Sequence, residues 1–363
     1  MRNAGEAGRA GHGRLYLAAG LAVAYIVLAQ IQSAPAAGQR QAMAGASRLM
    51  ARATEAIRDC REGRGLGPDP AADPNATGLV GLEASPITTS HGVLEAKRTT
   101  ANPEFAALVA SLLAEAGAKR GDVVAVGASS SFPALIVATL AAAEALGLEP
   151  LVISSLGASE YGANRPDFHW MDMEDCLRAA GVLDVRPVAR AVGGEGDVGL
   201  DMDAAGRDLL ASRIRAGAVP FLEEPDLARN VAARLALYRR AAAGRPIRAF
   251  VNIGGSTANI GSDASVLSLA PGLSRTVPLP PPDRRGVLQA MAAEGVPVVH
   301  LLNVKGLCER YGLPWDPRPL PAPGSARRLY RRPAGRSAAA AGLDAAFILA
   351  MSAWLLASRR RSL

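Results

Sequence analysis

The chain has 363 residues, of which 49% are hydrophobic and only 4% aromatic, and its formal net charge is +7. That charge lies at the two ends: residues 1–14 carry +2, residues 325–363 carry +7, and residues 15–324 carry −2. Nucleic-acid binding needs a basic surface on the folded domain, commonly with interleaved aromatic side chains. The distribution of charge therefore excludes a nucleic-acid partner. The basic residues lie beside two apolar segments, at 15–31 and 338–357, where they could contact the anionic headgroups of membrane lipids.

Cysteine and histidine are too few and too scattered to predict a metal site. The cysteines are Cys60, Cys176 and Cys308, and the histidines are His12, His91, His169 and His300. Neither set has the spacing of metal ligands. We expect isolated buried thiols, with one long-range disulfide as the alternative in an oxidising compartment.

Apolar segments near both ends predict two transmembrane helices. Residues 15–31 contain no charged side chain, and about 17 residues is the lower limit for crossing a bilayer. A secretory signal cleaved near residues 33–36 and a buried helix are the alternatives. Residues 338–357 contain a single charge, Asp344, and a C-terminal amphipathic helix is the alternative there.

Arginines flank both segments on the side away from the centre of the chain. Arg2, Arg9 and Arg14 precede the first segment, and the run at 359–361 follows the second. Cytoplasmic segments are enriched in such residues. Five arginines between 327 and 336 favour the opposite orientation, but long domains cross membranes largely regardless of charge. We therefore expect a protein of the inner cell membrane whose central domain is extracytoplasmic.

Composition divides the rest of the chain into a linker, one domain and a tether. Residues 1–14 and 358–363 are short tails, and residues 32–84 are predicted as a juxtamembrane helix followed by a Gly-, Pro- and Asp-rich linker. Residues 85–320 are long enough to form one α/β domain with its own core. Residues 321–337 are rich in Pro and Arg and predict a stiff tether.

A β-α-β unit stands early in this domain. Asn102 is a candidate helix cap, and residues 105–113 place apolar side chains on one helical face. The apolar run at 122–127 predicts a buried parallel strand. A helix at 133–146 and a strand at 150–154 complete the unit, which implies a right-handed crossover.

The alternation continues to the end of the domain. Further helices are predicted at 171–180, 204–216, 225–243, 285–294 and 305–311, and further strands at 184–189, 247–253 and 296–302. Strands that alternate with helices indicate a parallel sheet covered by helices. The predicted fold class is α/β, with a mostly parallel, Rossmann-like open sheet, flanked by the two transmembrane helices.

Small polar residues follow three of the predicted strands, in the loops at 127–133, 154–159 and 254–261. Open α/β sheets bind ligands beyond the carboxyl ends of their strands, and N–H groups and hydroxyls there suit a phosphate or a carboxylate. The candidate ligand-binding residues are Ser129, Ser130, Ser131, Ser155, Gly254, Gly255, Ser256, Thr257 and Asn259, with Lys97 and Arg98 from just before the first clear helix. Alternatively, these are ordinary turn residues and a solvated charge pair.

A serine nucleophile is a separate hypothesis. Ser129 and Ser131 lie between a strand and a helix, as in a nucleophile elbow, although the second Gly of G-x-S-x-G is absent. His169 is the candidate base, because His300 lies inside an apolar strand. The loop matches neither G-x-x-x-x-G-K-[ST] nor G-x-G-x-x-G, and we predict no cofactor and no metal.

Several short motifs, in order, resemble one bacterial family. They are SPIT (85–88), LEAKRT (94–99), NPxFAA (102–107), GDVVAVG (121–127), SFPAL (131–135), ISS (153–155), YGAN (161–164), PDF (166–168), NIGGS (252–256) and GVPV (295–298). The chain resembles the poly-gamma-glutamate system protein family over about residues 78–315. The serine loop of that family reads G-x-S-G-S-F-P, and Ser130 replaces its second Gly here, which weighs against a close approach of a ligand to that backbone.

The resemblance implies an accessory role, other than ligation, in making or exporting poly-gamma-glutamate. The implied partners are the membrane subunits of that system and the polymer itself, and no catalytic residue is carried over. Three hypotheses remain open. The domain binds a carboxylate-bearing polymer or precursor, or it is a serine-dependent amide hydrolase or transferase acting on the polymer, or it is a membrane scaffold that binds no ligand.

Overall fold

The computed structural model describes residue 16 and residues 18–26, 37–331 and 338–360. They form two units: a compact unit from Gly38 to Tyr330, and a second unit from the described residues outside that range. The compact unit extends beyond the predicted 85–320 at both ends. The predicted N-terminal tail, the cleavage motif at 33–36 and part of the tether lie outside the described residues.

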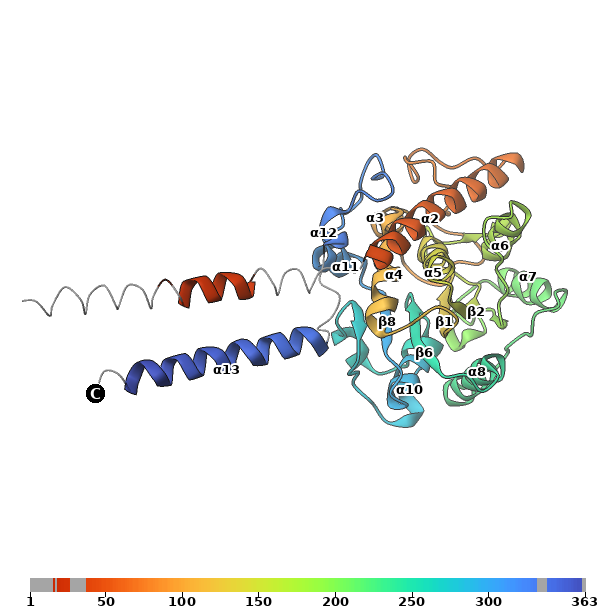
Figure 1. Cartoon of the computed structure of the whole chain (residues 1–363). Coiled ribbons are helices and arrows are strands. Elements are labelled where there is room, and N and C mark those ends of the chain that lie inside the picture. The colour runs from red at the N-terminus through yellow and green to blue at the C-terminus, as the bar shows by residue number, and fades with distance from the viewer. Residues whose placement is uncertain (1–15, 17, 27–36, 332–337, 361–363) are drawn as a thin grey trace, which may run out of the picture. The chain divides into compact units, whose positions relative to one another are not determined.

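A six-stranded sheet runs through the compact unit (Figure 1). Its strands are β1 (Val123–Ser129), β2 (Glu149–Ser155), β5 (Ala189–Ala191), β6 (Ile247–Ile253), β7 (Gly272–Ser274) and β8 (Val298–Leu301). They lie in the order β5-β2-β1-β6-β8-β7, all parallel except β7 at one edge. The predicted α/β class with a mostly parallel sheet is confirmed.

The path of the chain across this sheet has one turning point. After β1 the chain moves through β2 to β5, and it then returns to β6, which pairs with the other side of β1. Rossmann-like sheets follow this order, and they bind ligands where the path reverses. The carboxyl ends of β1 and β6 therefore mark the expected position of a ligand.

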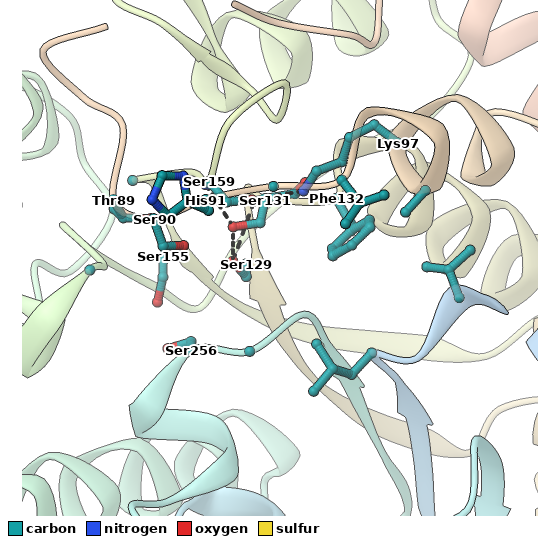
Figure 2. Close-up of a pocket in the computed structure, with 18 of the residues that line it drawn as sticks. Thr89, Ser90, His91, Lys97, Ser129, Ser131, Phe132, Ser155, Ser159 and Ser256 are labelled. Atoms are coloured by element: carbon teal, nitrogen blue, oxygen red, sulfur yellow. Dashed lines mark hydrogen bonds between the residues drawn. The ribbon is translucent and has the colours of Figure 1, made fainter. Parts of the chain in front are cut away.

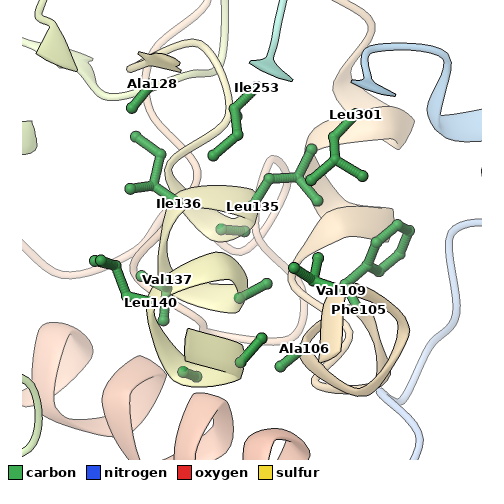
Figure 3. Packing of buried hydrophobic residues seen from close by; sticks show 14 of the residues in the cluster. Phe105, Ala106, Val109, Ala128, Leu135, Ile136, Val137, Leu140, Ile253 and Leu301 are labelled. Carbon is green, nitrogen blue, oxygen red and sulfur yellow. The ribbon is translucent and has the colours of Figure 1, made fainter. Parts of the chain in front are cut away.

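Helices cover both faces of the sheet. They are α2 (Ala37–Gly63), α3 (Leu94–Thr100), α4 (Glu104–Ala116), α5 (Pro133–Leu146), α6 (Trp170–Ala179), α7 (Ala204–Arg215), α8 (Leu227–Ala242), α9 (Thr257–Ile260), α10 (Val287–Ala293), α11 (Val304–Tyr311) and α12 (Arg327–Tyr330), with a small hairpin of β3 (Asn164–Arg165) and β4 (Phe168–His169). Side chains alternate along β1: Val124 and Val126 pack with α4 and α5, whereas Val123 and Ala125 pack with α8 and α10. Figure 3 shows Ala128, from the same strand, beside Ile136 of α5.

Local sequence sets the bounds of the helices beside the site. α5 occupies its predicted residues, because Pro133 suits the first turn and Gly147 takes the left-handed φ of 66° that ends the helix. α4 begins at Glu104, one residue later than predicted, with Pro103 in the cap position. Asn102 Oδ1 still accepts a hydrogen bond from Glu104 N at 3.0 Å. By contrast, the predicted strand at 184–189 is misplaced. Pro187 has no N–H for the ladder, and β5 begins only at Ala189.

Helix α2 belongs to the core of the compact unit. Met43, Met50 and Ile57 on this helix are fully buried, and Ser47 Oγ donates to Glu104 Oε1 of α4 at 2.7 Å. A disulfide between Cys60 and Cys176 joins α2 to α6, with a Cα–Cα distance of 5.9 Å. The prediction of isolated thiols is therefore wrong for this pair, because the packing of α2 against α6 brings the two cysteines together. The prediction is confirmed for Cys308, a buried free thiol.

The second unit contains a helical segment at 18–26 and helix α13 (Ala338–Arg360). Tyr25 stacks on Phe347 with ring centroids 4.1 Å apart, and its hydroxyl donates to Asp344 Oδ1 at 2.5 Å. The one carboxylate of the second apolar segment thus has a partner. Within the described ranges, no helix is both long enough and apolar enough to cross a membrane.

Candidate functional site

A cavity of about 670 Å³ opens at the carboxyl edge of the sheet, where β1 and β6 end. Its walls come from the loops that follow β1, β2, β6 and β8, from the segment at 89–97, and from residues between 194 and 201. The segment at 89–97 reaches this edge because Thr88 forms a β-bridge with Ala158. Figure 2 shows serines from separate loops facing this one space. The topology therefore assembles a pocket where Rossmann-like sheets bind ligands.

The loop after β1 presents two hydrogen-bonded serines to the cavity. Ser129 Oγ donates to Ser131 Oγ at 3.1 Å, and Ser159 N donates to the same oxygen at 3.0 Å (Figure 2). Because Ser131 Oγ accepts two hydrogen bonds, its own hydrogen remains for a ligand. Ser130 is fully buried and does not line the cavity. Its backbone is outside the left-handed region, so this position does not require Gly.

Lys97 lies in the wall of the cavity, on α3. Its ammonium nitrogen Nζ is 2.6 Å from the carbonyl oxygen of Ser131 and 2.7 Å from Ser159 Oγ. The same nitrogen stands 3.8 Å from the centroid of the Phe132 ring. The residue is only 4% exposed. Burial lowers the pKa of Lys97 to about 7, although the nearby Glu160 carboxylate raises it in part. Near neutral pH this amine therefore exists in both protonation states.

Arg98, the neighbour of Lys97, has a different position. Its guanidinium binds both carboxylate oxygens of Asp316, at 2.7 and 2.8 Å, and it does not line the cavity. Successive residues of a helix point in different directions. The two basic residues therefore do not act as one anion-binding pair.

Beneath the loop after β2 lies a buried ionic network. Arg234 and Asp197 form an ion pair with side chains 0% and 2% exposed. Ser155, which lines the cavity, donates through Oγ to Asp197 Oδ1 at 2.9 Å and accepts from Arg234 at 3.1 Å. Asn230 also donates to Asp197, at 3.1 Å. This network fixes the Ser155 hydroxyl at the floor of the cavity.

The loop after β6 forms the opposite wall. Gly255, Ser256 and Thr257 line the cavity, and the N–H groups of Gly255 and Ser256 have no acceptor in the part of the chain that the structure describes. Gly254 has a φ of +77° and does not line the cavity.

Asn259 is buried behind the same loop. A Cβ at Gly127 would lie 2.5 Å from Asn259 Oδ1, so the glycine allows the loops after β1 and β6 to approach each other. Asn259 does not line the cavity.

The predicted base, His169, lies outside the cavity. It caps α6: its ring atom Nδ1 accepts a hydrogen bond from Met171 N at 3.3 Å, and its backbone N–H donates to Asp172 Oδ2 at 3.0 Å. Burial lowers the pKa of His169 to about 4. The structure therefore gives His169 a structural role. His300 is buried on β8, as predicted.

Several residues outside the predicted set line the cavity, and two of them lie next to the predicted residues or to Glu160. Ser159 is one, and His91, whose Nδ1 is 3.0 Å from Glu160 Oε1, is the other. Ser159 lies within a polar loop that the sequence does flag. His91 follows the run Thr88-Thr89-Ser90, a cluster of hydroxyls that is the one available signal.

Charges of both signs line the cavity. Lys97, Lys305, Glu195 and Asp201 all line it, and the Asp201 carboxylate accepts a hydrogen bond from Glu195 N at 2.8 Å. Among the residues with described positions, no group of three or more His, Cys, Asp or Glu side chains could hold a metal ion.

Comparison with protein-family models, curated proteins and solved structures finds no match to this chain. The function must therefore be argued from the cavity and its chemistry.

Proposed function

We propose that the compact domain binds a carboxylate-bearing chain, a glutamyl polymer or its precursor, in the cavity at the ends of β1 and β6. The observation that carries this proposal is the convergence of hydroxyls from four segments on one cavity with two lysines. The hydroxyl side chains are those of Thr89, Ser90, Ser129, Ser131, Ser155, Ser159, Ser256 and Thr257. Hydroxyls both donate and accept hydrogen bonds, which suits a chain that alternates carboxylates with amides.

The donors for a carboxylate come from the loops after β1 and β6 and from Lys305. The Ser131 hydroxyl follows β1, and its hydrogen is available because its oxygen accepts two hydrogen bonds. The N–H groups of Gly255 and Ser256 follow β6 and have no acceptor among the described residues. Lys305 is an exposed residue of the wall. Because the carboxylates of Glu195 and Asp201 also line the cavity, the net attraction of an anionic chain is small. We therefore expect weak binding that rises with chain length and falls with salt.

Replacing Lys305 by Gln tests this proposal. The change should weaken binding of glutamate oligomers by about two- to five-fold, the usual range for one exposed charge. Titration calorimetry of the purified full chain at low ionic strength measures this. Lys119→Gln is the matched control, because Lys119 is exposed and lies outside the cavity. Equal effects of both changes would refute a local role of Lys305. No binding of any chain length would favour the scaffold hypothesis.

We further propose that the protein is a membrane-anchored accessory component of a poly-gamma-glutamate synthesis or export system, in the inner membrane with its compact domain outside the cytoplasm. The family resemblance supports the system, and the apolar segments at 15–31 and 338–357 support the anchors. The Cys60–Cys176 disulfide supports the orientation, because disulfides persist in oxidising compartments. The Tyr25–Asp344 hydrogen bond supports the second anchor, because it provides a partner for the carboxylate.

A reporter fusion tests the orientation. An enzyme that is active only outside the cytoplasm, fused after Pro323, should be active, because Arg2, Arg9 and Arg14 favour a cytoplasmic N-terminus and the arginines at 359–361 favour a cytoplasmic C-terminus. The paired experiment uses a reporter that is active only inside the cytoplasm, fused at the same residue. Activity of the second reporter alone would overturn the extracytoplasmic placement.

A further inference from the structure

We propose that Ser159 is a nucleophile and Lys97 its general base, so that the cavity cleaves amide bonds in the chain that it binds. The identity of the substrate, a glutamyl amide, rests on the proposed function. The pairing of these two side chains rests on geometry alone. It is independent of the predicted nucleophiles Ser129 and Ser131.

The geometry of the pair suits proton transfer. Lys97 Nζ lies 2.7 Å from Ser159 Oγ, within the range that a base needs to accept a proton. The carbonyl oxygen of Ser131, 2.6 Å away, and the Phe132 ring, 3.8 Å away at its centroid, hold the same nitrogen from other directions. Lys97 and Ser159 are 4% and 6% exposed, and both line the cavity. The dyad is thus fixed in place, largely shielded from bulk water, and open to a ligand.

The two hydroxyls that the loop after β1 presents to the cavity lack such a base. Ser129 Oγ donates to Ser131 Oγ, and Ser131 Oγ accepts from Ser159 N. His91 is paired with Glu160. Ser159 differs from these two serines, because its hydroxyl oxygen is hydrogen-bonded to the Lys97 amine, and both residues line the cavity. Within the described part of the chain, no other cavity hydroxyl has a basic side chain of the cavity wall as its partner.

The protonation state of Lys97 is compatible with this role. Burial lowers the pKa of Lys97 to about 7, so near neutral pH a substantial fraction of the amine carries a free lone pair. In that form, the nitrogen still donates to the Ser131 carbonyl and accepts the hydrogen of the Ser159 hydroxyl. Burial is one of the means by which enzymes lower the pKa of a catalytic lysine.

The reaction balances without a cofactor. Ser159 Oγ attacks the amide carbonyl carbon, its proton passes to Lys97 Nζ, and the carbonyl π electrons move to oxygen. When this intermediate collapses, the C–N bond breaks, and the leaving amine takes the proton from Lys97. Water then attacks the Ser159 ester, giving its proton to Lys97. The C–Oγ bond breaks, Ser159 recovers the proton, and a carboxylic acid leaves.

Ser131 is the oxyanion donor in this scheme. Its hydroxyl oxygen is 3.0 Å from Ser159 N, and its own hydrogen is left over from the hydrogen bonds of the loop. That hydrogen can donate to the oxygen on which negative charge develops, as an oxyanion donor does. Ser131→Ala should therefore lower the turnover number more than it changes the Michaelis constant, whereas Ser131→Thr should restore part of the loss.

The experiment is covalent labelling of the purified full chain with a fluorophosphonate, followed by peptide mapping by mass spectrometry. We expect one adduct, on Ser159. Because the neutral amine is the active form, the labelling rate should rise about ten-fold from pH 6 to pH 8 around the Lys97 pKa of about 7. Ser159→Ala should abolish labelling. Ser111→Ala, a change at an equally buried serine, 6% exposed and outside the cavity, should leave the rate unchanged.

Lys97→Met should reduce the labelling rate at least 100-fold, the usual contribution of a general base, and its thermal unfolding shows whether the variant is folded. Mapping of the wild-type adduct decides the question even if this variant does not fold. An adduct on Ser129 or Ser131 would overturn the dyad. So would the absence of any adduct when glutamate oligomers still bind. If neither adduct nor binding is found, the proposed function fails as well.

Discussion

Arg234→Met should lower the free energy of unfolding by about 3–5 kcal/mol, the usual cost of leaving one charge of a buried pair without its partner. Arg234 is fully buried against Asp197, which is 2% exposed. Among the residues that the structure describes, the methionine variant would leave the Asp197 carboxylate with hydrogen bonds from Ser155 and Asn230 only. Urea denaturation of the purified full chain measures the change.

A second arginine of the same helix is a matched control for this change. Arg239, also on α8, pairs with Glu294, but the two side chains are 58% and 45% exposed. Arg239→Met should therefore cost at most about 1 kcal/mol. Adding Asp197→Asn to Arg234→Met should recover part of the loss, because Asn removes the unpaired charge and tolerates the φ of +59° at this position. Similar losses for Arg234→Met and Arg239→Met would show that burial does not govern the energetics of this pair.

The double change Arg234→Met with Asp197→Asn should also affect the cavity. Ser155 is held between Arg234 and Asp197, and it contributes a hydroxyl to the cavity wall. If the network positions this hydroxyl, the doubly substituted protein should bind glutamate oligomers more weakly even where its stability recovers. The buried ion pair would then serve the ligand site as well as the fold.

Cys60→Ser should lower the free energy of unfolding by about 4 kcal/mol. The Cys60–Cys176 bond joins residues 116 positions apart, and closing so long a loop restricts the unfolded chain strongly. Reduction of the wild-type protein should have the same effect, because it removes the same bond. Denaturation curves with and without reductant measure both.

Two comparisons make this prediction specific. Cys308 is a buried free thiol, so the Cys308→Ser protein should respond to reductant as the wild type does. The Cys60→Ser protein should not respond at all. A wild-type protein whose unfolding midpoint is unchanged by reductant would contradict a stabilising disulfide. It would also remove the main physical support for an oxidising, extracytoplasmic environment.

The sequence by itself determined the secondary structure around the site, since those signals are local. A continuous apolar run predicts β1, and Pro133 and Gly147 bound α5 where the structure has it. The alternation of strands and helices predicts the parallel sheet. Because the strands of such a sheet end at one edge, the sequence also predicts the serine loop after β1 and the glycine loop after β6 as ligand loops.

Tertiary structure alone decided which side chains meet there. The strand order brings β6 beside β1, and the Thr88–Ala158 bridge brings the segment at 89–97 to the same edge. Lys97 contacts Ser159 across 62 positions, and Arg98 contacts Asp316 across 218. Periodicity and turn residues report only on neighbours a few positions apart. They cannot show that adjacent basic residues serve different partners, or that Ser159 is the serine with a base.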